Sequence, residues 1–173
     1  AAEIGQTEVV SLLLGAGANV NQATTDKGAT PLFIATQNGN IEVVSLLFGG
    51  GAGVNQAMVD DNAMLLFVAV QNGHVKIVNL FLASGANVKQ SMTGCGWSPI
   101  FAAAYYGYIE VVKVLLECGA DKAVVTTAAH LGIEAGSTPL SVAIKKGHSE
   151  VASLLKNGIR EWNILRMVRD RGI

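Results

Sequence analysis

Charged residues are scarce in this sequence of 173 residues. Asp, Glu, Lys and Arg make up 14% of it, whereas about a quarter is usual for a soluble protein. Half of the residues are apolar, so the chain can bury a core and is not expected to be disordered. Residues 1–93 carry three Lys against six Asp and Glu, and residues 94–173 carry nine Lys and Arg against seven. Neither part has the basic excess expected of a nucleic-acid binder.

Long apolar runs and patterned cysteines are also missing. No run approaches the roughly 18 to 20 residues that span a membrane, and the start, AAEIGQTEVV, lacks the basic and apolar regions of a signal peptide. Cys95 and Cys118 fit no metal-ligand spacing and no disulfide framework. We therefore expect a soluble, cytoplasmic protein in a reducing compartment, with neither membrane nor nucleic acid as a partner.

The sequence contains no group of residues typical of catalysis. His130 has no carboxylate or cysteine at catalytic or ligand spacing, and no Gly-rich loop opens a helix as a phosphate site would. Asp60 and Asp61 are adjacent at a turn, where a solvated pair is the simpler interpretation than a metal site. Cys95, in TGCGW, is expected to be exposed but has no base nearby. The sequence thus predicts no enzyme, no cofactor and no metal.

Glycine, by contrast, is abundant and regularly spaced. One series, which we call the ladder glycines, consists of Gly5, Gly39, Gly73, Gly107 and Gly147. A second series lies twelve residues behind the first and consists of Gly17, Gly51, Gly85 and Gly119. Successive ladder glycines are 34 residues apart, except for a step of 40 before Gly147. Such a fixed period indicates a repeat architecture.

Related phrases surround the ladder glycines. Four of these glycines are preceded by TPLFIAT, MLLFVAV, SPIFAAA and TPLSVAI, at residues 30–36, 64–70, 98–104 and 138–144. The hydroxyl residues that open three of these phrases are predicted N-caps, each followed by proline at the first helical position: Thr30, Ser98 and Thr138. The spacing of Ile41, Val44 and Leu47 predicts a second helix behind the glycine. Because one helix pair cannot bury such stripes, the pairs must stack.

These phrases resemble the unit of the ankyrin-repeat family, which reads T-P-L-H-x-A followed by G-H-x-E-V-V-x-L-L-L-x-x-G-A-D-V-N over about 33 residues. The resemblance covers residues 1–158 and implies an all-α fold, a solenoid of stacked helix-turn-helix units joined by β-hairpin loops. It implies a single ankyrin-repeat domain over 1–173, with a truncated repeat at 1–25, further repeats at 26–59, 60–93, 94–133 and 134–158, and a C-terminal cap helix at 159–173. The truncated start leads us to expect a fragment of a longer array.

Three departures from the family pattern have consequences. Met64 replaces a hydroxyl cap typically worth about 1 kcal/mol, so this repeat is expected to fray first. The long step places six extra residues within 122–137; an elongated hairpin or short helical turn is one interpretation, and a finger that contacts a partner is the other. Residues 159–173 hold all four arginines, and a basic docking helix is the alternative to a cap there.

The resemblance also implies a binding face, formed by the hairpin tips and the last two positions of each first helix. These positions are Gln37, Asn38, Gln71, Asn72, Tyr105, Tyr106, Lys145 and Lys146, and the tips include Asp60, Asp61 and Trp97. We predict Tyr105, Tyr106 and Trp97 as contacts, since Tyr and Trp dominate interface hot spots. The alternative is that one tyrosine leans on the neighbouring repeat and Trp97 packs on its own hairpin. Tyr108 is predicted to be structural.

The family resemblance therefore implies a non-catalytic, monomeric module that binds another protein on its concave face. We expect the partner to offer an apolar or aromatic anchor for the aromatic residues and acidic residues for Lys145 and Lys146. The alternative is that the chain is the targeting arm of a larger enzyme or effector whose catalytic domain lies outside it.

Overall fold

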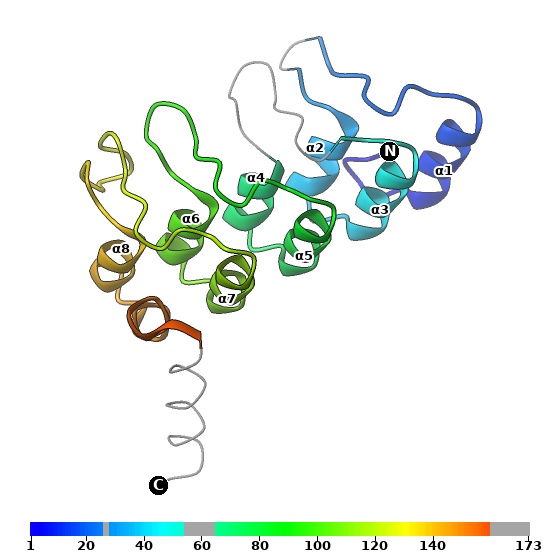
Figure 1. The fold of residues 1–173 in the computed structure, drawn as a ribbon. Helices are drawn as coiled ribbons and strands as arrows, with labels where there is room; N and C mark the ends of the chain where they lie inside the picture. The colour runs from blue at the N-terminus through cyan, green and yellow to red at the C-terminus, as the bar shows by residue number, and fades with distance from the viewer. Residues whose placement is uncertain (26–27, 54–64, 160–173) are drawn as a thin grey trace, which may run out of the picture. The chain divides into compact units, whose positions relative to one another are not determined.

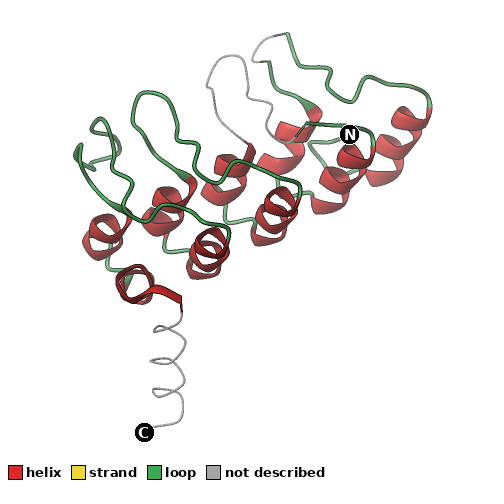
Figure 2. Ribbon diagram, in the orientation of Figure 1, coloured by secondary structure: helices red, strands yellow, loops and turns green. Residues whose placement is uncertain are grey.

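The computed structural model describes residues 1–25, 28–53 and 65–159. The chain divides into two compact units, Ala1–Asn87 and Val88–Ile173. The described residues form α-helices and loops without strands (Figure 2), and one isolated antiparallel bridge joins His130 and Ile133. The all-α prediction is confirmed. No helix of the described part is long and apolar enough to cross a membrane.

The first unit contains two rows of helices (Figure 1). These helices are α1 (Thr7–Gly15), α2 (Pro31–Gln37), α3 (Ile41–Gly49), α4 (Leu65–Gln71) and α5 (Val75–Ala83). Helices α2 and α4 pack side by side in one row, and α3 packs between α1 and α5 in the other. Because α2 also packs on α3 and α4 on α5, each helix pair buries its apolar stripe against a neighbouring pair.

The second unit repeats this arrangement with α6 (Pro99–Tyr106), α7 (Ile109–Glu117), α8 (Pro139–Lys145) and the helical residues 149–159. Helix α6 packs on both α7 and α8. Small residues allow this close approach: the alanines at the same position of successive first helices are completely buried in both units, at Ala35, Ala69, Ala103 and Ala143. A larger side chain at these positions would force the stacked helices apart.

The predicted helix starts are confirmed. The hydroxyl oxygens of the three predicted caps each accept a hydrogen bond from the third residue of the helix, and proline follows each cap, in α2, α6 and α8. At α8 the arrangement is reciprocal, because Thr138 Oγ1 accepts from Ser141 N at 3.1 Å while Ser141 Oγ accepts from Thr138 N at 2.9 Å. Such a capping box satisfies two backbone donors that the helix leaves unpaired.

The ladder glycines lie where one repeat meets the next. At Gly39 the φ angle is +74°, and a Cβ atom there would lie 2.6 Å from the ring of His74. His74 Nε2 lies 3.2 Å from the carbonyl oxygen of Gln37. Asn40, at the position equivalent to His74 in the preceding repeat, donates from Nδ2 to the carbonyl oxygen of Ala2 at 2.9 Å. The residue before each of these second helices thus bonds the backbone of the preceding repeat, which gives the histidine a structural role.

Two predictions concern residues that are not described. Met64, the replaced cap, falls in the gap at 54–64, and the predicted cap helix falls outside the described part except for Ile159. Both remain predictions, as do the repeat boundaries.

Candidate functional site

The predicted contact positions of the first unit lie on neighbouring helices. Gln37 and Asn38 end α2, Gln71 and Asn72 end α4, and all four are exposed. Asn38 Nδ2 donates to the carbonyl of Glu3 at 3.2 Å, and Asn72 Nδ2 donates to the carbonyl oxygen of Val68 at 2.9 Å. The two asparagine amides are thus held in place, while the glutamine side chains face solvent.

In the second unit the same helix positions bring tyrosines and lysines together. Tyr105 and Tyr106 end α6 and are half-buried, while Lys145 and Lys146 end α8 and are exposed. The Nζ atom of Lys146 lies 4.1 Å from the centre of the Tyr105 ring, a cation–π distance. The rings of Tyr105 and Tyr106 are in edge contact at 5.0 Å. We call these four residues the tyrosine–lysine surface.

The third tyrosine completes the aromatic row. Tyr108 precedes α7, and its ring stacks on that of Tyr106 with centroids 5.7 Å apart. Tyr106 therefore has aromatic neighbours on both sides, which restrict its side chain.

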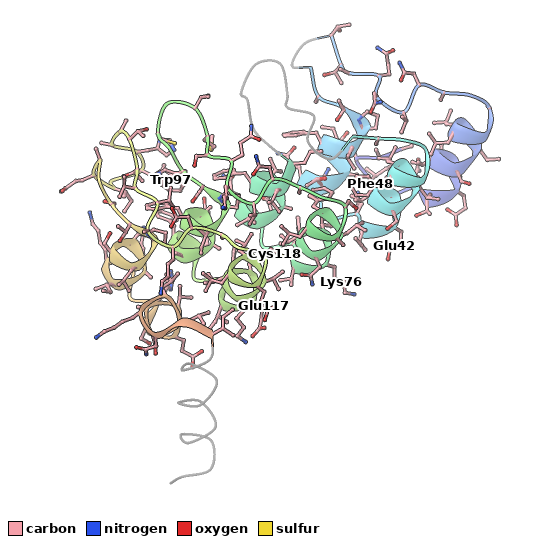
Figure 3. All side chains as sticks on the ribbon, in the orientation of Figure 1. Glu42, Phe48, Lys76, Trp97, Glu117 and Cys118 are labelled. Carbon is pink, nitrogen blue, oxygen red and sulfur yellow. The ribbon has the colours of Figure 1, made fainter. Side chains whose placement is uncertain are left out.

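The structure corrects the expectation that Trp97 contacts a partner. Its side chain is only 2% exposed. It lies between α6 and the loop before α8, with ring centroids 5.0 Å from Phe101, 4.9 Å from Tyr105 and 5.3 Å from His130 (Figure 3). Its carbonyl oxygen accepts from Met92 N at 2.8 Å, which closes the hairpin through the backbone. The three ring contacts are with α6 and the loop before α8, whereas the alternative placed the side chain on its own hairpin. Trp97 packs against the Tyr105 ring and, being buried, is not itself available for contact.

The expectation of an exposed thiol at Cys95 is also wrong. This side chain is 9% exposed, and its backbone oxygen accepts from Thr127 N at 3.0 Å. Cys118 is exposed, and neither cysteine is in a disulfide. Among the described side chains, no three His, Cys, Asp or Glu residues come together as metal ligands would. Asp60 and Asp61 lie outside the described residues.

The six extra residues form a longer hairpin tip before α8. Corresponding backbone hydrogen bonds close three hairpins, from Thr24 N to Ala29 O, from Met92 N to Trp97 O and from Thr126 N to Ser137 O. The first two bonds enclose four residues each, and the third encloses ten, residues 127–136. We call this segment the inserted loop. The difference of six equals the difference between ladder steps of 40 and 34.

The inserted loop is folded against the rest of the second unit. Thr127 donates from its N–H to Cys95 O at 3.0 Å and from Oγ1 to Gly94 O at 3.1 Å. Lys145 Nζ donates to Gly132 O at 2.9 Å. Ile133 is 2% exposed. The loop therefore lies beside the tyrosine–lysine surface, a placement that the length of the ladder step alone did not reveal.

A second feature is an apolar cleft of about 330 Å³ in the first unit. Helix α1 contributes Val10, Leu13 and Leu14, and the loop before α2 contributes Ala18 and Val20. Leu12, on the same helix, is 74% exposed. This cleft was not predicted from the sequence, although an apolar helix without a preceding TPL phrase indicated it.

Stacked helix pairs, capped by hydroxyl residues and joined at ladder glycines, define a helical repeat protein. A family model for ankyrin repeats matches the chain in three overlapping copies, at residues 1–92, 50–126 and 66–164. The chain belongs to the ankyrin-repeat family, whose repeats generally mediate protein–protein interactions and are typically non-catalytic. No curated protein matches it.

Proposed function

We propose that this protein is a non-catalytic module that binds another protein through the tyrosine–lysine surface of its second unit. The observation that carries the proposal is the contact of Lys146 with the Tyr105 ring at 4.1 Å, beside Tyr106. Helices α6 and α8 pack side by side, so this contact joins the C-terminal ends of the first helices of two adjacent repeats. It combines apolar area, hydroxyl groups and positive charge in one place.

The chemistry of this surface specifies its partner. Tyrosine offers a large amphipathic contact at low cost in side-chain entropy. Lys145 and Lys146 are exposed, and their positive charges favour carboxylates. We therefore infer a partner segment that places an apolar or aromatic side chain on the tyrosines and acidic residues near the lysines.

The tyrosine–lysine surface is formed before binding. His148 Nε2 lies 3.0 Å from the carbonyl oxygen of Tyr105, and Lys146 already contacts the Tyr105 ring. Binding then requires little further ordering of these side chains, which reduces the entropic cost of association. In the first unit, the exposed amides of Gln37, Asn38, Gln71 and Asn72 are proposed as further polar contacts, and Asp60 and Asp61 remain predicted ones.

Peptides selected from a random display library against the purified protein test this proposal. We expect the selected peptides to be enriched in Asp and Glu next to Phe, Tyr, Trp or Leu. Labelled copies should then bind about tenfold more weakly to the Tyr106→Ala variant and to the Lys146→Glu variant, as for hot-spot residues. The Lys156→Glu variant is the matched control, since Lys156 is exposed on another helix of the same unit.

Tyr105→Ala is a less informative variant, because it also removes a ring contact with Trp97. The Tyr105→Ala/Tyr106→Ala double variant is still expected to weaken binding by about tenfold or more. Selected peptides without acidic enrichment, or an affinity that Tyr106→Ala and Lys146→Glu leave unchanged, would contradict the proposal.

A further inference from the structure

The tip of the inserted loop is a two-residue turn that contains an unusual residue, Leu131. His130 N donates to Ile133 O and Ile133 N donates to His130 O, both at 2.9 Å, so Leu131 and Gly132 form the turn between them. Their φ angles are +48° and +73°. A two-residue hairpin turn with both φ angles positive is of type I′, which strongly prefers Asn-Gly or Gly-Gly.

Leucine is poorly suited to this conformation. Among the described residues, Leu131 alone combines a positive φ angle with a side chain. Burial does not explain the choice of leucine here, because Leu131 is 56% exposed. A strained residue whose side chain faces solvent is a candidate for a contact outside the chain.

The surroundings of Leu131 connect it to the tyrosine–lysine surface on both sides. The preceding residue, His130, stands edge-on to Trp97 at 5.3 Å, and Trp97 packs on Tyr105 at 4.9 Å. The following residue, Gly132, accepts from Lys145 Nζ through its carbonyl oxygen. The turn thus contacts Trp97, which packs against Tyr105, and Lys145, which belongs to the tyrosine–lysine surface.

The inserted loop is held firmly enough to present its tip. Ile133 is buried at 2% exposure. Thr126 Oγ1 donates to Glu134 O at 2.8 Å and accepts from Ser137 N at 3.1 Å, which closes the base of the loop. At Gly96, a Cβ atom would lie 2.9 Å from Thr127, so the loop also packs closely on the neighbouring hairpin. An apolar side chain on such a support loses little freedom on binding.

We propose that Leu131 is an apolar contact residue that extends the tyrosine–lysine surface onto the inserted loop. The occupant is an acidic, apolar segment of a partner protein: its carboxylates face Lys145 and Lys146, and an apolar side chain packs against Leu131. Positive charge supports this choice, because residues 127–148 carry two Lys against one acidic residue, Glu134. This inference rests on the proposed function and adds to it the residue that distinguishes this chain from repeats with a short tip.

The variant Leu131→Asn tests the inference. Asparagine suits the positive φ angle and gives the Asn-Gly turn that a type I′ hairpin prefers, so the loop is expected to keep its fold while losing the apolar side chain. Peptides selected against the parent protein for the proposed function are the probe. Their affinity should fall about tenfold with Leu131→Asn, as for a hot-spot residue. Leu131→Gly, equally suited to the turn, should have the same effect.

The matched control is Leu12→Asn, which replaces a leucine that is 74% exposed on α1 of the first unit. It should leave peptide affinity unchanged. Circular dichroism of each variant checks that the helices remain folded. If Leu131→Asn and Leu131→Gly bind the peptides as the parent does while Tyr106→Ala weakens binding, the inference is overturned and the proposed function stands. If Tyr106→Ala and Lys146→Glu also have no effect, both are overturned.

Discussion

The imidazole of His148 packs against the backbone of Gly107, so closely that a Cβ atom on the glycine would lie 2.6 Å from His148 Nδ1. Nε2 of the same ring lies 3.0 Å from the carbonyl oxygen of Tyr105. One side chain of the later repeat thus contacts the glycine that ends the first helix of the earlier repeat, and it lies at hydrogen-bonding distance from the backbone of a proposed binding residue. Stacking of the repeats and the position of Tyr105 are coupled at this point.

Gly107→Ala measures this contact, with Gly147→Ala as its matched control. Both glycines have φ of +79°, but a Cβ atom on Gly147 would meet nothing within 4 Å. The left-handed conformation costs each alanine about 1–2 kcal/mol of unfolding free energy. Gly107→Ala should lose roughly 1–3 kcal/mol more, because the His148 ring must move. Urea unfolding measures both; equal losses would show that the ring contact is not tight.

His148→Ala and His148→Asn separate the hydrogen bond from the ring. His148→Ala should lower the unfolding free energy by about 1 kcal/mol through the lost hydrogen bond, and further through lost packing. His148→Asn should recover part of that loss, since Asn40 donates from the corresponding position to the carbonyl of Ala2. Denaturant unfolding of the two variants side by side provides the measurement. An asparagine variant no more stable than the alanine variant would contradict the assigned role.

The sequence predicted the roles of Gly107 and Thr138 because these roles depend on local conformation. A glycine at positive φ and a hydroxyl before proline are required by the backbone of a single repeat, so Gly107 and Thr138 were recognisable from spacing alone. The burial of Trp97 was not, because it depends on His130, which lies 33 residues later and reaches it only through the fold of the inserted loop. The exposure of the tyrosines, likewise, is set by neighbouring repeats.

Thr138→Ala tests the capping box that begins α8. It removes the acceptor of Ser141 N, and the expected loss of unfolding free energy is about 1 kcal/mol. Ser141→Ala keeps that bond and removes the two bonds of the Ser141 hydroxyl, which accepts from Thr138 N and donates to Thr138 O. It should cost less, because Ser141 is exposed and alanine is the better helix former. Thermal unfolding followed by circular dichroism measures both variants. Equal costs would contradict this expectation.

Leu131→Asn is expected to change stability in the direction opposite to its effect on binding. Relief of the left-handed strain at φ of +48° should raise the unfolding free energy by about 1 kcal/mol. Leu12→Asn, in contrast, should lower it by roughly 0.5 kcal/mol because asparagine is a poorer helix former than leucine. Urea unfolding of both variants measures these changes in unfolding free energy. A less stable Leu131→Asn protein would show that the leucine is retained for packing and not for contact.

Variants of Trp97 test whether this residue only supports the tyrosine–lysine surface or is part of it. Trp97→Ala should cost about 3–5 kcal/mol of unfolding free energy, since it empties a site that is 2% exposed and removes three ring contacts. Trp97→Phe should cost much less: it keeps an aromatic ring and removes Nε1, which is buried without a hydrogen-bond partner among the described residues. Because Trp97 does not reach the surface, Trp97→Phe should also leave the affinity for the selected peptides nearly unchanged. Unfolding in urea and peptide titration of this variant give the two readouts. A stable Trp97→Phe protein with a large loss of peptide affinity would return Trp97 to the contact residues, and the burial of its ring would then have to change on binding.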